Sequence, residues 1–204
     1  MKSQSLLVVV LAVLVGLGVI IALGSFGLIA WLVPMTSTTV TSTPGSFDSG
    51  EGCAKGPEGT IPLINQDHGY CVRYLEGFTE SYPTFAITKL VGQTPAQESN
   101  HAELHIEMTP SEDRTADMVA DELLAEYASS VPGSNVVRSA ITLGDEAAVL
   151  LESVPGQDMS RKVIAVYGER LFILTFLPWN KDSSIVSQQL VELYSMVVET
   201  WEFH

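Results

Sequence analysis

The stretch GYCVRYLEGF, Gly69 to Phe78, opens the part of the chain whose residue pattern decides the fold. Its residues alternate as they do in a β-strand, with Tyr70, Val72 and Tyr74 on one face and Cys71 on the other. One of the chain's two cysteines therefore lies in a strand that has an apolar, aromatic face. Such a strand is typical of a sheet that packs one side against a core.

Beyond about Thr60 the chain is a series of short alternating or apolar runs separated by turn residues, which predicts strands. The predicted strands span 69–75, 84–90, 101–108, 135–142, 146–153, 160–167 and 170–177. Two stretches show a helical period instead, at about 114–130 and 183–203. Because the links between strands are short, we expect a mostly antiparallel sheet flanked by the two helices, which is an α+β fold, over residues 60–204.

The N-terminal part has the character of a membrane segment. After Lys2 the chain runs from Leu6 to Val33 without a charge, which is longer than the roughly 20 residues that cross a bilayer as a helix. No small-residue cleavage site follows this run. We therefore expect a short cytoplasmic N-terminus at 1–5 and a retained transmembrane anchor at 6–33, with a cleaved signal peptide as the alternative. The positive-inside rule then places the rest of the chain outside the cytoplasm.

Residues 34–59 are rich in Thr, Ser, Gly and Pro and nearly lack large apolar side chains, so they are expected to form a flexible tether. The chain carries 10 Lys and Arg against 24 Asp and Glu, a formal net charge of −14. A surface this acidic repels nucleic acid and anionic lipid headgroups, so neither DNA nor RNA is an expected partner.

The two cysteines have two possible roles. Outside the cytoplasm a pair of cysteines in one chain is usually bridged, and a Cys53–Cys71 disulfide would tie the tether to the first predicted strand. The alternative is that Cys71 is a free thiol that serves as a small core residue.

Several segments together resemble the PsbP/Mog1-like domain family. They are DHGYCVRYLEGF from Asp67 to Phe78, then GDEAAVLLE, SRKVIAVYGERLFILTF with Trp179 after it, and VVETWEF near the end. The chain departs from the family pattern at Leu75, where proline is common, and at Phe78, where tryptophan is common. The resemblance covers about residues 60–204 and implies an α/β/α sandwich with an accessory or binding role. It implies no ligand site that can be carried over residue by residue.

The most suggestive polar stretch is HAELHIEM, His101 to Met108, in which His101, Glu103, His105 and Glu107 share one face of a strand. Neighbouring members of this face are close enough to share a metal ion, but His101 and His105 are about 13 Å apart along a strand and are not expected to bind the same ion. A solvated strand face is the favoured interpretation, and a metal site is the alternative.

Other signals of chemistry are weak. Asp113, Asp117 and Asp121 suit the start of a helix better than a calcium loop. Trp179 is interpreted as a cap on the core, with a pocket at the sheet edge as the alternative. The sequence has no GxSxG, no CxxC and no convincing Ser/His/Asp set.

We therefore predict a membrane-anchored, extracytoplasmic, non-catalytic module that binds a protein partner and takes no cofactor. The alternative is a metal-dependent or hydrolytic enzyme that uses His101, Glu103 and His105.

Overall fold

The structure, a computed structural model, describes residues 53, 56–96, 98–180 and 184–204. All of them belong to a compact unit that spans Asp48–His204. The expected N-terminus at 1–5, the expected anchor at 6–33 and residues 34–52 of the expected tether lie outside the described residues. Within the described ranges, no helix is both long enough and apolar enough to span a membrane.

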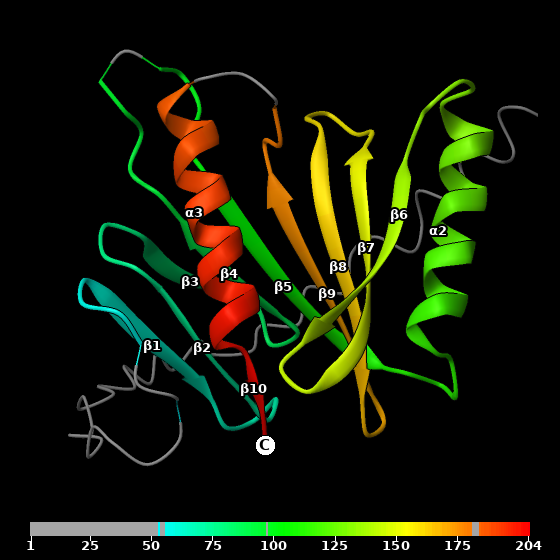
Figure 1. Ribbon diagram of the computed structural model, residues 1–204, viewed down its shortest axis with the longest axis horizontal. Coiled ribbons are helices and arrows are strands. Elements are labelled where there is room, and N and C mark those ends of the chain that lie inside the picture. Colours follow the sequence, from blue (N-terminus) through cyan, green and yellow to red (C-terminus); the bar gives the residue numbers. More distant parts are fainter. Residues whose placement is uncertain (1–52, 54–55, 97, 181–183) are drawn as a thin grey trace, which may run out of the picture. The chain divides into compact units, whose positions relative to one another are not determined.

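A seven-stranded antiparallel sheet forms the middle layer of this unit (Figure 1). In spatial order its strands are β3 (Thr79–Thr84), β4 (Ile87–Val91), β5 (Glu103–Pro110), β9 (Arg170–Leu177), β8 (Ser160–Tyr167), β7 (Glu146–Val154) and β6 (Val137–Leu143). The pairing of β5 with β9 joins the strands before the first helix to the strands after it.

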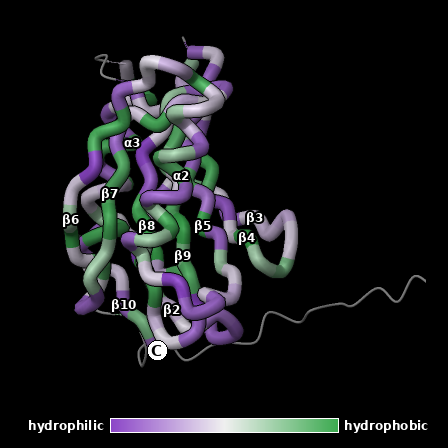
Figure 2. Tube along the Cα trace, turned by 90° about the vertical axis from the view of Figure 1, so that its right-hand side faces the viewer, coloured by the Kyte–Doolittle hydropathy of each residue, from purple (hydrophilic) through white to green (hydrophobic). Residues whose placement is uncertain are grey.

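The two faces of this sheet are covered by different elements. A three-stranded sheet in the order β1 (Thr60–Asn65), β2 (Tyr70–Leu75) and β10 (Glu202–Phe203) lies with α3 (Ile185–Thr200) on one face. On the other face lies α2 (Ala116–Ser130), which contacts β7 and β8. Figure 1 shows the three layers edge-on, and Figure 2 shows α2 in front of the sheet.

The central strands are apolar on both faces, and this explains why two coverings are needed. In β9, Phe172 and Leu174 belong to the cluster under α3, whereas Leu171 and Ile173 belong to the cluster under α2. Successive side chains of a strand point to opposite faces, so a continuous apolar run requires burial on both sides. The hydrophobic colour along β9 in Figure 2 shows this property.

Polar caps fix where the two helices begin. The Thr115 side chain accepts a hydrogen bond from the backbone N–H of Met118 at 3.2 Å, and the Ser184 side chain accepts one from Ser187 at 3.1 Å. Each cap satisfies a backbone donor that has no partner inside its helix.

Strand β2, the core of the opening stretch, holds the small sheet to the main one. The Tyr70 ring is fully buried and stacks on Trp201, with the ring centroids 4.8 Å apart. Its hydroxyl donates to Thr88 of β4 at 2.9 Å, so burial of the ring leaves no unsatisfied polar group. One side chain thus joins β2, β4 and the end of α3.

Cys53 and Cys71 form a disulfide, with their Cα atoms 5.6 Å apart, and no described cysteine is free. The predicted bridge is therefore present, and the free-thiol alternative for Cys71 is wrong. Cys71 is fully buried, so it fills core space as well as carrying the bridge.

Each predicted strand and both predicted helices have a counterpart, but three strands were not predicted. In β1 (TIPLIN) and β3 (TESYPT), proline interrupts the strand pattern, and β3 is mostly exposed, so it lacks the apolar alternation that marks a strand. The third, β10, consists of Glu202 and Phe203, which the helical period had wrongly included in the second predicted helix; α3 ends at Thr200. The structure also divides the strands between two sheets where one was expected.

We predict that the substitution Cys53→Ser lowers the free energy of unfolding by about 3 kcal/mol, because the bridge closes a loop of 18 residues in the unfolded chain. Urea denaturation followed by circular dichroism measures this difference. Cys53 is the better position to change, because a serine at the buried position 71 would add the cost of a buried hydroxyl. Equal unfolding curves for the two proteins without reductant would contradict the prediction.

Candidate functional site

The polar stretch that the sequence singled out lies on and just before β5. The side chains of Leu104 and Ile106 point into the core and are at most 1% exposed. The alternate side chains, Glu103, His105 and Glu107, therefore point to the opposite face of the sheet. His101 precedes the strand and reaches the same side.

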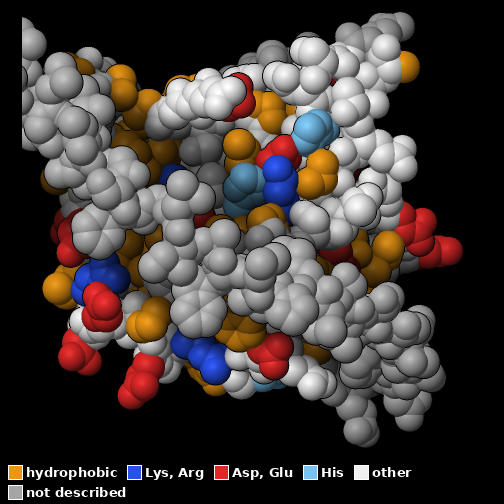
Figure 3. Space-filling model, turned by 180° about the vertical axis from the view of Figure 1, so that it is seen from behind, with side chains coloured by type: hydrophobic (Ala, Val, Ile, Leu, Met, Phe, Trp, Pro, Cys, Tyr) orange, Lys and Arg blue, Asp and Glu red, His pale blue; other side chains and the backbone are white. Residues whose placement is uncertain are grey.

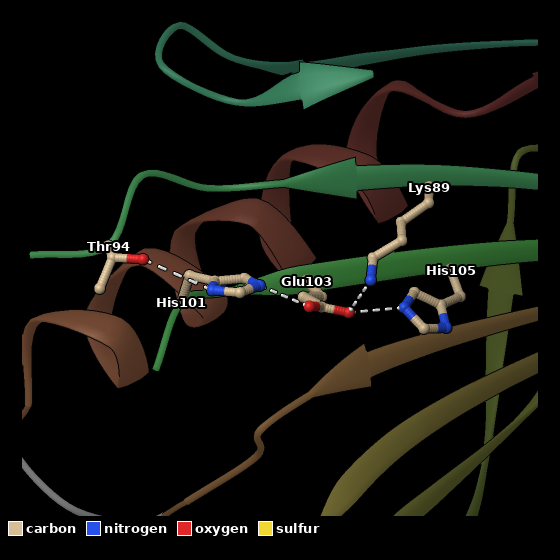
Figure 4. A network of polar contacts seen from close by, with 5 residues as sticks. All are labelled: Lys89, Thr94, His101, Glu103 and His105. Carbon is tan, nitrogen blue, oxygen red and sulfur yellow. Dashed lines mark hydrogen bonds and ion pairs between the residues drawn. The ribbon is translucent and has the colours of Figure 1, made fainter. Parts of the chain in front are cut away.

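Glu103 is the centre of a contact network on this face (Figure 4). His101 donates from Nε2 to Oε1 of Glu103 at 2.5 Å, and His105 donates from Nε2 to Oε2 at 2.7 Å. Lys89 of β4 forms an ion pair with the same Oε2 at 2.6 Å. Since an ionised carboxylate only accepts hydrogen bonds, both imidazoles carry a proton on Nε2 in this arrangement.

The network controls the ionisation of Glu103, whose side chain is 16% exposed. Burial alone would raise the pKa of its carboxyl group. Hydrogen bonds from Lys89, His105 and His101 outweigh burial and hold the pKa below its ordinary value. Glu103 is therefore a stable anion at neutral pH and is poorly suited to donate a proton as a general acid.

Strand register extends the polar face across the sheet. Lys89 of β4 lies opposite His105, His105 lies opposite Thr175 of β9, and Thr175 lies opposite Lys162 of β8. We call these four residues the polar row. Helix α2 contacts β7 and β8, so Lys162 on β8 lies at the edge of the part of the sheet that the helix covers. From there the row runs across the sheet to Lys89 on β4. The view from behind (Figure 3) shows histidine, acidic and basic side chains gathered on one surface.

Lys162 is the most enclosed cation of the polar row. Its Nζ donates to the Thr175 hydroxyl at 2.9 Å. Burial lowers the pKa of its ammonium group, although the negative charges of Glu107 and Glu126 act in the opposite direction. The row therefore has a half-buried lysine at one end and a paired lysine at the other.

The geometry bears on the metal alternative. No group of three His, Cys, Asp or Glu side chains among the described residues is arranged to hold a metal ion. The estimate of about 13 Å between His101 and His105 considered only the backbone. In the structure both imidazoles point toward Glu103. Each carboxylate oxygen of Glu103 accepts a hydrogen bond from the Nε2 atom of one imidazole, so these two nitrogen atoms already have a partner.

The other candidates have structural partners. Arg138 of β6 pairs with Asp117 and Asp121 of α2, which ties the edge strand to the helix. Trp179 is 9% exposed, and the Arg161 guanidinium lies 3.6 Å from its ring centroid. These contacts are those of a core cap, the role that the sequence favoured for Trp179.

Sequence reasoning missed both lysines of the polar row. Lys89 and Lys162 lie far apart in the chain, and only strand register brings them into line. A signal was available for Lys162, because this lysine directly precedes the apolar run Val163 to Val166 of a strand expected to be central, and a lysine there requires an explanation.

Comparison with known proteins finds similarity to solved structures at low sequence identity. No family model matches the chain. No curated protein matches its sequence. Similar solved structures include cyanobacterial PsbP from Synechocystis, which is 10% identical over 76% of this chain and 98% of that chain, with a TM-score of 0.48. PsbP is one of the two proteins after which the PsbP/Mog1-like family is named.

A crystal structure of a protein from Bacteroides thetaiotaomicron is similar to the same degree. It is 13% identical over 72% of this chain, with a TM-score of 0.48. This chain matches 49% of that protein, which is about half of its length.

We predict that the substitution Glu103→Gln lowers the free energy of unfolding at pH 7 by about 1–3 kcal/mol, because it removes a charged acceptor that serves three donors. A carboxyl group whose pKa is lowered in the folded state stabilises the fold above its ordinary pKa, and this contribution is lost as the pH falls through the folded pKa. The variant should therefore lose less stability than the wild type between pH 7 and pH 3.

Urea denaturation at several pH values measures both effects. Glu107→Gln is the matched control, because Glu107 is an exposed glutamate on the same face of the same strand. If both variants shift stability equally, the network around Glu103 does not have the stabilising role that we assign to it.

Proposed function

We propose that this domain is a non-catalytic binding or accessory module. In this proposal the apolar segment at 6–33 anchors the chain in a membrane, and the domain engages a protein partner on the extracytoplasmic side. The disulfide is compatible with an oxidising compartment, where such bonds form and persist.

The observation that carries the proposal is the closed contact network around Glu103. A general base needs a lone pair that is free to accept a proton from a substrate, and a metal ligand needs one that is free to bind the ion. Here the carboxylate is shared by His101, His105 and Lys89, so the polar groups satisfy one another. Such an arrangement gives a surface of fixed charges and donors, which suits the recognition of a partner.

The position of the polar row supports the same proposal. It lies on a sheet face that α2 covers at β7 and β8. Its charged groups are spaced by strand register and are held by the sheet, so they are preorganised for contact. Preorganised polar groups lower the entropic cost of association.

The expected topology can be tested directly. Protease added to intact cells should degrade the domain, because an anchor at 6–33 with its N-terminus in the cytoplasm places residues 60–204 outside. Immunoblotting with an antibody against the C-terminal part measures the protection, and a cytoplasmic protein is the control for cell integrity. Full protection of the domain in intact cells, followed by degradation after lysis, would overturn the topology.

The partner surface can be tested by site-specific crosslinking in intact cells. A photo-crosslinking residue in place of the exposed Glu107 should give one discrete adduct, identified by mass spectrometry. The same residue in place of Met118, which is 50% exposed on α2, is the control and should not give that adduct. No adduct from position 107, or the same adduct from both positions, would contradict a partner surface on the face that Glu107 shares with His105 of the polar row.

The enzyme alternative has its own test. Metal analysis of the purified full-length chain decides between the two functions. Stoichiometric zinc that is lost on substitution of His101, Glu103 or His105, together with turnover of a substrate, would replace the binding proposal.

A further inference from the structure

Strand β6 (Val137–Leu143) forms one end of the seven-stranded sheet and pairs with β7 alone among the described strands. Figure 2 shows it at the left margin of the sheet, while α2 lies in front of the neighbouring strands. In a strand at the end of a sheet, every second residue directs its backbone N–H and C=O groups away from its neighbour. We call this outer side of the strand the β6 edge.

The β6 edge is regular and accessible. The strand pairs with β7 in one register, from Val137 opposite Glu152 to Leu143 opposite Glu146, without a bulge. Residues 137–140 and Thr142 are exposed. The β6 edge therefore presents a continuous row of backbone donors and acceptors, and an extended polypeptide can add a strand to such a row.

The other sheet edges among the described residues carry features that hinder further pairing. Strand β3, at the opposite end of the large sheet, contains Pro83 and has a bulge between Ser81 and Thr84. In the small sheet, β1 contains Pro62 and β10 has only two residues. Proline lacks a backbone donor, and bulges and very short strands also protect an edge. Strand β6 has none of these features.

A charged side chain can protect an edge as well, and the only charged residue of β6 is Arg138. Its guanidinium forms ion pairs with Asp117 and Asp121 of α2. These pairs hold the charge toward the helix, above one face of the sheet. Arg138 therefore does not protect the β6 edge in the way that an unpaired charge would.

The side of the β6 edge that faces α2 is acidic. Since side chains alternate along a strand, Ala140 and Thr142 share this side with Arg138. Two carboxylates face one guanidinium here, and the side chains of Asp117 and Asp121 are 73% and 67% exposed. A second cation can therefore approach them, and the small side chain of Ala140 leaves room for a long one on an added strand.

The side of the β6 edge that faces α3 is apolar. Leu143 is buried in the cluster under α3, and Ile141 packs against that cluster. Val137 lies on the same side and is 47% exposed. An added strand would therefore meet apolar surface on this side and carboxylates on the other.

These two sides determine which occupant fits. A second copy of the chain would bring a formal charge of −14 to an edge that is already acidic, and like charges repel. A segment with basic residues at alternate positions and apolar residues between them is attracted instead. It also matches both sides, because its side chains alternate with the same period of two.

We propose that the β6 edge binds an extended segment of a protein partner as an additional strand, with basic side chains toward Asp117 and Asp121 and apolar ones beside Val137. This inference rests on the proposed function in that it takes the ligand to be part of a protein. The crosslinking experiment at position 107 tests the proposed function on β5 without involving β6, so the two can fail separately.

The experiment measures binding of the peptide Ac-Lys-Val-Lys-Val-Lys-Val-Lys-NH₂, which carries a neutral fluorophore, to the full-length chain in a zwitterionic detergent. Fluorescence anisotropy should rise to saturation as the protein is added. A peptide of the same composition in which the valines and lysines form two blocks should bind more weakly, because it cannot place the two kinds of side chain on opposite sides.

Two modified peptides separate strand pairing from simple charge attraction. In one, two of the valine N–H groups are methylated, and in the other, two of the lysine N–H groups. In an extended segment the N–H groups of these two sets point to opposite sides, so only one set can donate to β6. One methylated peptide should therefore bind about tenfold more weakly than the probe or worse, and the other should bind as the probe does.

A matched pair of substitutions locates the site. Thr142→Lys adds a positive charge at an exposed position of β6 and should raise the Kd of the probe about fivefold, as expected for a like-charge pair across two strands. Thr84→Lys makes the same change at an exposed position of β3, the other end of the sheet, and should leave the Kd unchanged. A thermal unfolding curve for each variant separates loss of binding from loss of folding.

Four results would overturn the proposal. They are no saturable binding of the probe, equal affinity of the two methylated peptides, and equal effects of the two lysine substitutions. The fourth is a dimer of the chain in analytical ultracentrifugation that Thr142→Lys converts to a monomer, since a second copy would then occupy the β6 edge.

Discussion

The structure depends on one constraint, which is that the central strands of the seven-stranded sheet are apolar on both faces. Phe172 and Leu174 must be buried on one side of β9, and Leu171 and Ile173 on the other. Two coverings of unequal extent meet this need, with α3 and the small sheet on one face and α2 on the other. The polar row begins with Lys162 on β8, a strand that α2 contacts, and runs across β9 and β5 to Lys89 on β4. It therefore lies at the margin of the cover that α2 provides.

The covering on the α3 side also shapes a concave region at the end of α3, which is lined by the β6–β7 turn, the end of β8, the last turn of α3 and β10. Trp201 ends α3 and is held by its stack on Tyr70 and by edge contacts with Phe172. These contacts fix where the helix stops, so its C-terminal carbonyl groups and Glu199 meet the β6–β7 turn. The short strand β10 then pairs with β2 and brings Phe203 to Tyr167. The same packing that buries the core thus positions the acidic and aromatic side chains that line this concave region.

The sequence allowed the strand and helix types to be predicted where periodicity was strong, as in β9 and α3. It also allowed the disulfide to be predicted, because only two cysteines were available. It did not reveal β3, whose exposed polar residues form a strand only because β4 offers its edge. It did not place Lys89 beside His105 or the Glu199 helix end beside Asp145, because these neighbours are set by register and turn geometry and not by spacing along the chain.

Two charged regions of the domain differ in how their charges are balanced. Around Glu103, the cation and the anion are paired within the domain, so this network is a fixed pattern of donors and acceptors whose charges are already balanced. At the end of α3, Asp145, Glu146 and Glu199 form no ion pair with a described basic side chain, and the helix C-terminus adds partial negative charge there. Salt therefore acts mainly on this second region, because its charges are not balanced locally.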